Sequence, residues 1–419
     1  MCPAGSLWQH QSGVFPAGAA VAARVAGQAN LTATIAEYCA YMRRHVTYLA
    51  VPLCLFGLLL ARSAFADQVD RANPVDGTRP LDGAKLYEQA CAACHGSDGR
   101  GRPLEERGFV LELPDFTDCE FASREPDPDW HAVIHEGGPV RAFDRMMPAF
   151  GDALTDEEIY AILGHVRTFC TNDNWPRGEF NVPKPLFTEK AFPEDETVFN
   201  VRLDTDDSKA VVIEPLYEKR FGPRGMIEAK VPFGRRQTGG DDGAEIGFGD
   251  LTVGYRYALY HNLDRGNAFS IGGEVVLPTG DEDNGFGAGS TKLEPHVSFV
   301  QLLPGDAFLQ SQVQMDFAVT GSALDKGIVR TAIGRTFTEG EFGRAWSPMV
   351  ELLASRETVS EADVTLDLVP QMQVALNTRQ HILLNVGVRV PVANSQGRKA
   401  QIVMYLLWDW FDGGFRDGW

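Results

Sequence analysis

The sequence contains few basic residues for its length. Its 419 residues include 38 lysines and arginines against 57 aspartates and glutamates, which gives a formal net charge of −19. A surface with this balance repels phosphate backbones, so we expect no nucleic acid partner. Strong low-complexity tracts are also missing, and glycine and aromatic residues are plentiful. Most of the chain is therefore expected to be ordered.

Long apolar runs are scarce as well. The run Tyr48–Leu60 is too short to be read as a membrane-spanning helix. Two arginines precede it, and the A-x-A cleavage pattern of Ala64–Ala66 follows it. We therefore predict that residues 1–66 are a mis-called start plus a signal peptide at 42–66, followed by a short linker at 67–77. The alternative is an N-terminal membrane anchor.

Cysteine is sparse too, with seven residues, but two of them form a motif with a specific chemistry. Cys91, Cys94 and His95 have the spacing C-x-x-C-H, the attachment signature of a c-type haem. Two thiols one helical turn apart add to the two vinyl groups of one porphyrin, and the adjacent histidine reaches the iron. A zinc site or a redox pair would also use C-x-x-C, but zinc needs two more ligands nearby. We expect one covalently bound haem c.

Two further cysteines, Cys119 and Cys170, remain after the predicted cleavage site. In an exported, oxidising compartment we expect them to form a disulfide. The bond would close a loop of about 50 residues, worth roughly 4 kcal/mol in the chain-entropy model. The alternative is two buried free thiols.

The segment that follows the motif supplies a second candidate ligand. A helix is expected to lead into the motif and to stop at Gly96. Further on, "RMMPAFGDALTDEEIYAILGHVRTFC" resembles the end of class I cytochromes c, in which a methionine before a proline ligates the iron. By that resemblance Met147, which precedes Pro148, is the second axial ligand. Met146 is the alternative, with packing near the haem edge as its other role. The resemblance covers 78–170 and implies an all-α cytochrome domain.

The last helix of this segment has its own start signal. Thr155 and Glu158 form the pattern of a capping box, and the apolar stripe after it begins at Ile159.

His131 and His135 lie four residues apart, so they could replace Met147 or bind a metal. The simpler interpretation is two half-exposed helix histidines, because two ligands alone do not complete a metal site.

A proline-rich stretch then separates two patterns. Residues 171–196 contain Pro176, Pro183, Pro185 and Pro193, a density that favours a stiff, extended linker without helix or paired strand.

From residue 197 to 419 the hydrophobic period changes to two. In 308–319, for example, apolar residues from Leu309 to Val319 share one face while Gln310, Gln312 and Gln314 take the other. The pattern predicts about twelve strands, near 197–204, 209–220, 224–233, 247–260, 267–278, 290–303, 306–319, 327–338, 344–355, 362–377, 381–391 and 399–411.

Their connections distinguish a barrel from a soluble sandwich. Tight turns such as "LPGD" alternate with longer polar loops such as "TGDEDNGFGAG". Short turns on one side and long loops on the other predict an antiparallel transmembrane β-barrel of the outer membrane. Strands of this length cross a bilayer when tilted, and closure leaves no unpaired edge in lipid.

The second half resembles the outer-membrane barrel family named for phenol-degradation pathways. The resemblance lies in "GFGDLTVGYRYAL", 247–259, and "GGEVVLPTGDED", 272–283, and it implies uptake of small aromatic compounds. The whole architecture resembles the fused cytochrome–porins of bacteria that exchange electrons with extracellular donors, notably ferrous iron.

The second resemblance implies an electron carrier with its cytochrome domain facing the periplasm. Its partners would be a periplasmic electron-transfer protein, outer-membrane lipid and an extracellular electron donor or acceptor. As an enzyme it would be an outer-membrane ferrous iron oxidase, although no catalytic cluster is readable in the sequence. The alternative function is transport of a small aromatic or cationic solute through a lumen lined by Glu274, Asp316, Asp367 and Arg389.

Overall fold

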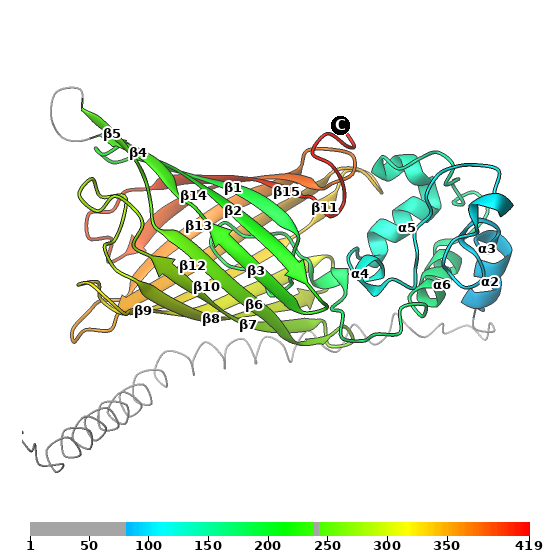
Figure 1. Cartoon of the computed structure of the whole chain (residues 1–419), viewed down its shortest axis with the longest axis horizontal. Coiled ribbons are helices and arrows are strands. Elements are labelled where there is room, and N and C mark those ends of the chain that lie inside the picture. The colour runs from blue at the N-terminus through cyan, green and yellow to red at the C-terminus, as the bar shows by residue number, and fades with distance from the viewer. Residues whose placement is uncertain (1–80, 238–242) are drawn as a thin grey trace, which may run out of the picture. The chain divides into compact units, whose positions relative to one another are not determined.

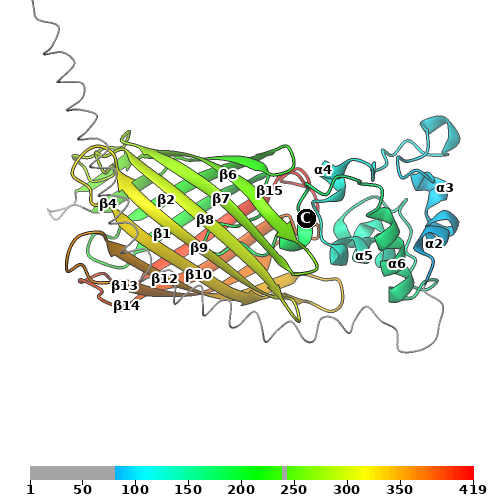
Figure 2. The same ribbon diagram turned by 90° about the horizontal axis from the view of Figure 1, so that it is seen from below.

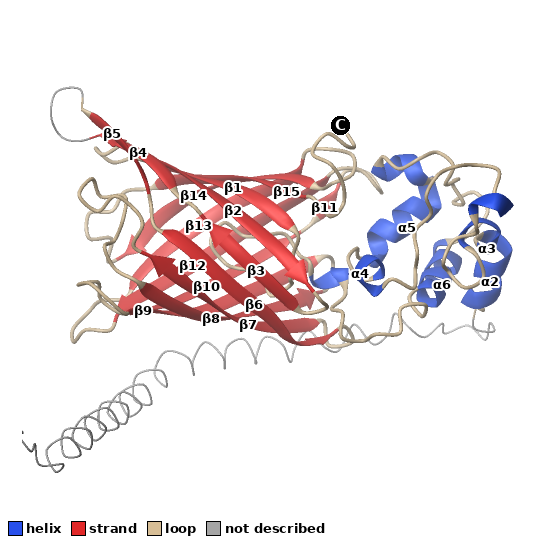
Figure 3. Ribbon diagram, in the orientation of Figure 1, coloured by secondary structure: helices blue, strands red, loops and turns tan. Residues whose placement is uncertain are grey.

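The computed structural model describes residues 81–237 and 243–419, so the predicted signal peptide and the linker at 67–77 lie outside the described residues. Helices occupy the first part of the described chain and strands the second (Figure 3). The helices are α2 (Gly83–Ala90), α3 (Ala92–His95), η2 (Leu104–Glu106), α4 (Cys119–Ala122), α5 (Asp127–Glu136), η3 (Gly138–Arg141), α6 (Asp156–Val166) and η4 (Gly178–Phe180). No described helix combines the length and the apolar character needed to cross a bilayer.

The haem-motif helix forms where the sequence predicts it, with one break. Asp82 caps α2 by accepting a hydrogen bond from the Lys85 backbone N–H at 3.1 Å. The helix breaks at Cys91 and resumes as α3, which ends at Gly96 with φ of +73°. Glycine adopts this left-handed conformation without a steric penalty, so Gly96 stops the helix directly behind His95.

Helices α2 and α6 cross at close range and form the centre of the helical domain. A side chain at Gly83 would collide with the backbone carbonyl of Ala161, so only glycine permits this approach. Around the crossing, Tyr87 packs with Phe116, Ile162 and Val166 in one buried apolar cluster. Helix α6 begins with the predicted capping box of Thr155 and Glu158, and its predicted apolar stripe is buried.

Strands that pair with each other run antiparallel. They are β1 (Glu196–Asp204), β2 (Val211–Phe221), β3 (Gly225–Lys230), β4 (Phe233–Gln237), β5 (Ala244–Phe248), β6 (Leu251–Asn262), β7 (Asn267–Leu277), β8 (Lys292–Leu303), β9 (Ala307–Ala318), β10 (Lys326–Arg335), β11 (Phe337–Thr338), β12 (Ala345–Glu357), β13 (Thr365–Ala375), β14 (Ile382–Ala393) and β15 (Gln401–Asp409). Tight turns such as 304–306 alternate with long loops such as 278–291.

The sheet closes on itself. Strand β1 pairs with β2 on one side and with β15 on the other, and every pairing is antiparallel. Among the described strands, twelve form this ring, while β4 and β5 extend one hairpin beyond it and β11 adds a short pairing to β12. The strands run obliquely around a common axis (Figures 1 and 2). The predicted antiparallel barrel of about twelve strands is confirmed.

The barrel is polar inside and apolar outside. On β9, Gln310 and Gln312 are both 1% exposed, whereas Val313, which follows Gln312, is 45% exposed. On β6, Arg256 is 1% exposed, whereas its neighbour Tyr255 is 44% exposed. A soluble sandwich would bury the apolar face, so this distribution excludes that alternative and fits a wall surrounded by lipid.

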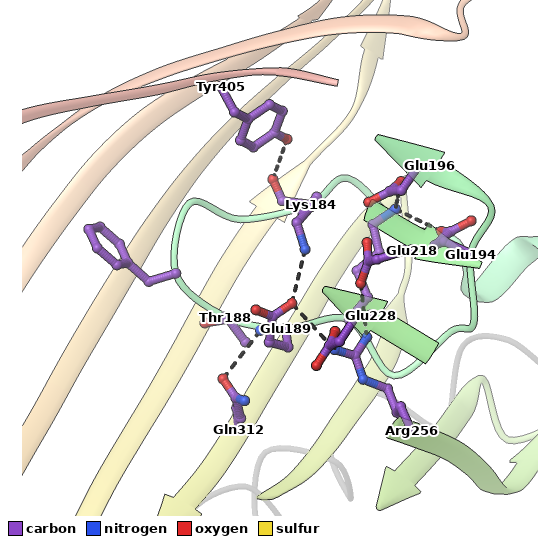
Figure 4. A network of polar contacts seen from close by, with 12 residues as sticks. Lys184, Thr188, Glu189, Glu194, Glu196, Glu218, Glu228, Arg256, Gln312 and Tyr405 are labelled. Carbon is purple, nitrogen blue, oxygen red and sulfur yellow. Dashed lines mark hydrogen bonds and ion pairs between the residues drawn. The ribbon is translucent and has the colours of Figure 1, made fainter. Parts of the chain in front are cut away.

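The second part of the proline-rich segment lies inside the barrel. Phe180, Val182 and Phe192 form a buried apolar cluster with wall residues that include Phe308 and Met349. The segment contains only the short helix η4 and has no paired strand before β1. We call residues 180–195 the plug, because they occupy the lumen (Figure 4).

Candidate functional site

The C-x-x-C-H motif spans the break between α2 and α3. Cys91 and Cys94 are half-buried, and neither forms a disulfide with another cysteine of the described residues. The ring of His95 stacks on Phe116 with a centroid separation of 4.9 Å. Its Nδ1 atom is buried without a hydrogen-bond partner. The motif therefore presents two available thiols and one imidazole that has an unsatisfied nitrogen.

Burial sets the protonation of these groups. Desolvation, with a smaller contribution from the neighbouring Cys94, raises the pKa of the Cys91 thiol to about 11. Burial also lowers the pKa of His95 below its usual value, because it disfavours the charged imidazolium. A neutral imidazole keeps a lone pair for a metal, so the site favours ligation by His95 at neutral pH.

The two candidate methionines differ in environment. Met147 is half-buried and packs against the apolar cluster of Ile134, Ile159 and Leu163. Met146 is 47% exposed, and its backbone N–H donates to the Asp144 carboxylate at 2.9 Å. The interior position of Met147 favours it over Met146 as the sulfur ligand.

The two histidines of α5 are engaged with carboxylates. His131 Nε2 lies 3.0 Å from Asp156 Oδ1, and His135 Nδ1 lies 2.9 Å from Glu136 Oε1. Their rings stack at 5.8 Å. His131 is 5% exposed and is therefore more buried than the half-exposed position expected from the sequence. These contacts satisfy one nitrogen of each ring and favour a structural role.

A disulfide joins Cys119, at the start of α4, to Cys170, just after α6. The two Cα atoms are 5.0 Å apart, and the bond closes a sequence separation of 51 residues. A loop of that length corresponds to about 4 kcal/mol in the chain-entropy model. The bond thus joins the start of α4 to the chain that follows α6, next to the segment that leads into the barrel.

The plug is held by polar side chains of the barrel wall. Glu351 of β12 is fully buried and accepts hydrogen bonds from the backbone N–H and the hydroxyl of Thr188, both at 2.7 Å. The Tyr405 hydroxyl donates to the backbone carbonyl of Lys184 at 2.6 Å. Gln310 donates to the carbonyl of Pro183 at 2.8 Å. Side chains of the wall thus form hydrogen bonds that the backbone groups of the plug would otherwise make with water.

The charged lumen residues predicted from the sequence are paired. Glu274 contacts Lys230 at 2.9 Å, and Asp367 accepts from Arg389 Nε at 2.7 Å. Asp316 accepts from Gln314 at 2.7 Å. All four predicted lining residues therefore take part in side-chain interactions of the barrel interior, as barrel side chains commonly do.

Two family models match the chain, one in each half. The model described as "Cytochrome C oxidase, cbb3-type, subunit III" matches residues 78–166. The model described as "Putative MetA-pathway of phenol degradation" matches residues 205–347. The helical and barrel parts thus correspond to two separate families.

A curated relative matches the helical part. The fructose dehydrogenase cytochrome subunit of Gluconobacter japonicus is 34% identical over 103 residues, which are 23% of this chain and 20% of that subunit. The match thus spans about a fifth of the length of that relative.

Solved barrels show a low overall similarity. An outer membrane channel from Pseudomonas putida F1 is 14% identical with a TM-score of 0.41, covering 54% of this chain and 99% of the channel. The KdgM porin is 10% identical with a TM-score of 0.33, covering 51% of this chain and 98% of the porin.

The helical half is a cytochrome c domain, and the second half is an outer-membrane β-barrel. The protein is a fusion of these two classes. A cytochrome c domain implies haem c, and the described residues fit that group. The two thiols of Cys91 and Cys94 are available, and His95 carries a buried nitrogen without a partner.

Proposed function

We propose that this protein is a haem c electron carrier of the outer membrane. It passes single electrons between a periplasmic carrier protein and an outer-membrane or extracellular donor or acceptor. The observation that carries the proposal is the motif itself, with two unbonded thiols beside a buried histidine that has an unsatisfied nitrogen. A plugged lumen adds support, since a barrel whose interior is occupied by its own chain suits an anchor better than a pore.

The roles of the site residues follow from their chemistry. Cys91 and Cys94 would tether one haem through two thioether bonds, and His95 and Met147 would supply the ligands of its iron. The haem supplies a one-electron iron couple. The thioether sulfur of Met147 favours the reduced iron, so Met/His ligation gives a potential on the high side for haem. With His95 and Met147 both supplying ligands, the haem would be suited to electron transfer and not to oxygen binding.

The cytochrome domain faces the periplasm in this proposal. Phe180, the first residue of the plug, packs against Phe308, which lies just after the tight turn at 304–306. The chain therefore enters the barrel at the end that carries the tight turns. In outer-membrane barrels the short turns are periplasmic. The stretch 171–179 then connects the cytochrome domain to that end.

Replacing Met147 by leucine tests the ligand assignment. The Met147→Leu variant is expected to lose the near-infrared methionine–iron charge-transfer band and to lower the reduction potential, because the iron loses its soft sulfur ligand. The matched control is Met146→Leu, which changes an exposed neighbour and should leave the band intact. Absorption spectra of the oxidised proteins provide the measurement. Loss of the band in the control alone would assign the ligand to Met146.

A further inference from the structure

The barrel lumen contains a group of ion-paired charges around Glu189 with more acids than bases. Plug and wall contribute Glu189, Glu218, Glu228 and Glu274, against Lys184, Lys230 and Arg256. Figure 4 shows Glu189, Glu218, Glu228, Lys184 and Arg256 of this group. These four acids and three bases leave an excess of one negative charge when all are ionised. Buried charge that is not offset is costly in a low-dielectric interior.

Three of these carboxylates converge. Glu189 lies on the plug, Glu218 on β2 and Glu228 on β3, and one oxygen of each lies within 4.8 Å of the others. Glu218 and Glu228 are direct cross-strand partners in the β2–β3 pairing. Like charges in directly opposite positions destabilise a sheet, so this pair requires a compensating positive charge.

The bases nearby do not satisfy Glu218. Its side chain is 1% exposed, and neither of its carboxylate oxygens has a hydrogen-bond partner among the described residues. Its ion pair with Arg256 is long, at 3.9 Å. Arg256 Nη2 lies closer to Glu228 and Glu189, at 3.2 and 3.4 Å, so that guanidinium offsets those two acids first. An unpartnered, buried carboxylate pointing into a group of two others indicates a missing ligand.

We propose that Glu189, Glu218 and Glu228 bind a divalent cation. The donor set consists only of carboxylate oxygens, which suits hard cations such as Mn²⁺, Mg²⁺ and Ca²⁺. One divalent ion would supply positive charge next to Glu218, whose carboxylate oxygens lack a hydrogen bond among the described residues. Because Glu189 belongs to the plug while Glu218 and Glu228 belong to the wall, the bound ion also fastens the plug to the barrel. This site is independent of the haem and of the direction of electron flow.

Titration of the purified full-length protein with Mn²⁺ tests the site. After treatment with a chelator and its removal, the wild type is expected to bind one Mn²⁺ per chain, measured by the loss of the electron paramagnetic resonance signal of free Mn²⁺. The Glu218→Gln variant should weaken this binding by about tenfold or more, because it replaces a charged ligand with a neutral amide. The Glu189→Gln variant, altered on the plug instead of the wall, should weaken it similarly.

The control is Glu294→Gln, which changes another acid of the lumen that lies outside the group of three and accepts from Gln314 at 3.2 Å. This variant should bind Mn²⁺ as the wild type does. Heat-modifiable migration on a gel verifies that each barrel is folded. The proposal is overturned if the wild type binds no stoichiometric Mn²⁺ or if Glu218→Gln binds with unchanged affinity. Equal weakening by Glu294→Gln would also overturn it, because it would indicate only a diffuse negative field.

Discussion

Replacing Cys91 and Cys94 together by alanine will abolish covalent haem binding. The wild-type chain is expected to keep its haem through a denaturing gel, because thioether bonds survive unfolding. The double variant has no thiol at the motif, so its band should show no haem-dependent peroxidase staining. Any haem held by His95 and Met147 alone would dissociate when the chain unfolds. The expected change is complete loss of the stain at equal protein load.

The matched control replaces the other cysteine pair. A chain with Cys119→Ser and Cys170→Ser loses the disulfide but keeps both thiols of the motif. Its cytochrome domain should be less stable by about 4 kcal/mol, yet it should retain the stained band. Persistent staining of the Cys91 and Cys94 double variant would show that the haem is attached elsewhere or that the motif has another role.

Removing the plug will open the barrel to small solutes. We propose replacing residues 182–190 by a glycine–serine linker of equal length, which deletes the side chains that pack against the wall. The contacts of Thr188 with Glu351 and of Lys184 with Glu189 would be lost. Liposomes containing the wild type should swell in a small sugar no faster than empty liposomes. The plug variant should swell severalfold faster, because its lumen is polar and no longer filled.

This permeability experiment has a control replacement and a result that would contradict the prediction. The same replacement in the loop at 359–363 alters the barrel without touching the plug, so it should leave the liposomes sealed. Rapid swelling with the wild type would instead favour the transport alternative, in which a small solute passes through the charged lumen. The two functions are thus separated by permeability, since a sealed barrel still anchors an electron carrier.

The repeating parts of the structure could be read from the sequence. Alternation of apolar and polar residues specified the wall strands, because each strand exposes one face to lipid and the other to the lumen. The strand predicted at 306–319 corresponds to β9, and the one predicted at 267–278 corresponds to β7. Local signals were equally reliable in the helical part, where Thr155 and Glu158 marked the start of α6.

The plug could not be predicted, because its location depends on distant partners. Proline density indicated an extended segment, and the segment is irregular, but nothing local specified that it would enter the lumen. Its contacts join residues far apart in sequence, such as Thr188 and Glu351. One signal was available: Phe180, Val182 and Phe192 are too apolar for a solvated linker.

The strand boundaries near prolines and glycines were also imprecise. A single strand was expected at 224–233, whereas β3 ends at Lys230 and β4 begins at Phe233. Pro232 lies in the gap and has no backbone N–H for the ladder. The haem-site prediction rests on a short-range signal, because the C-x-x-C-H spacing is a requirement of the attachment chemistry.

A redox titration of the purified full-length protein tests the central proposal most directly. We predict one reversible haem transition per chain, with a one-electron slope of about 59 mV per decade and a potential on the high side for haem. The spectrum should change between low-spin ferric and low-spin ferrous forms. A protein that shows no reversible transition, or a high-spin ferric haem with an open axial position, would contradict the account of a six-coordinate electron carrier held in the outer membrane.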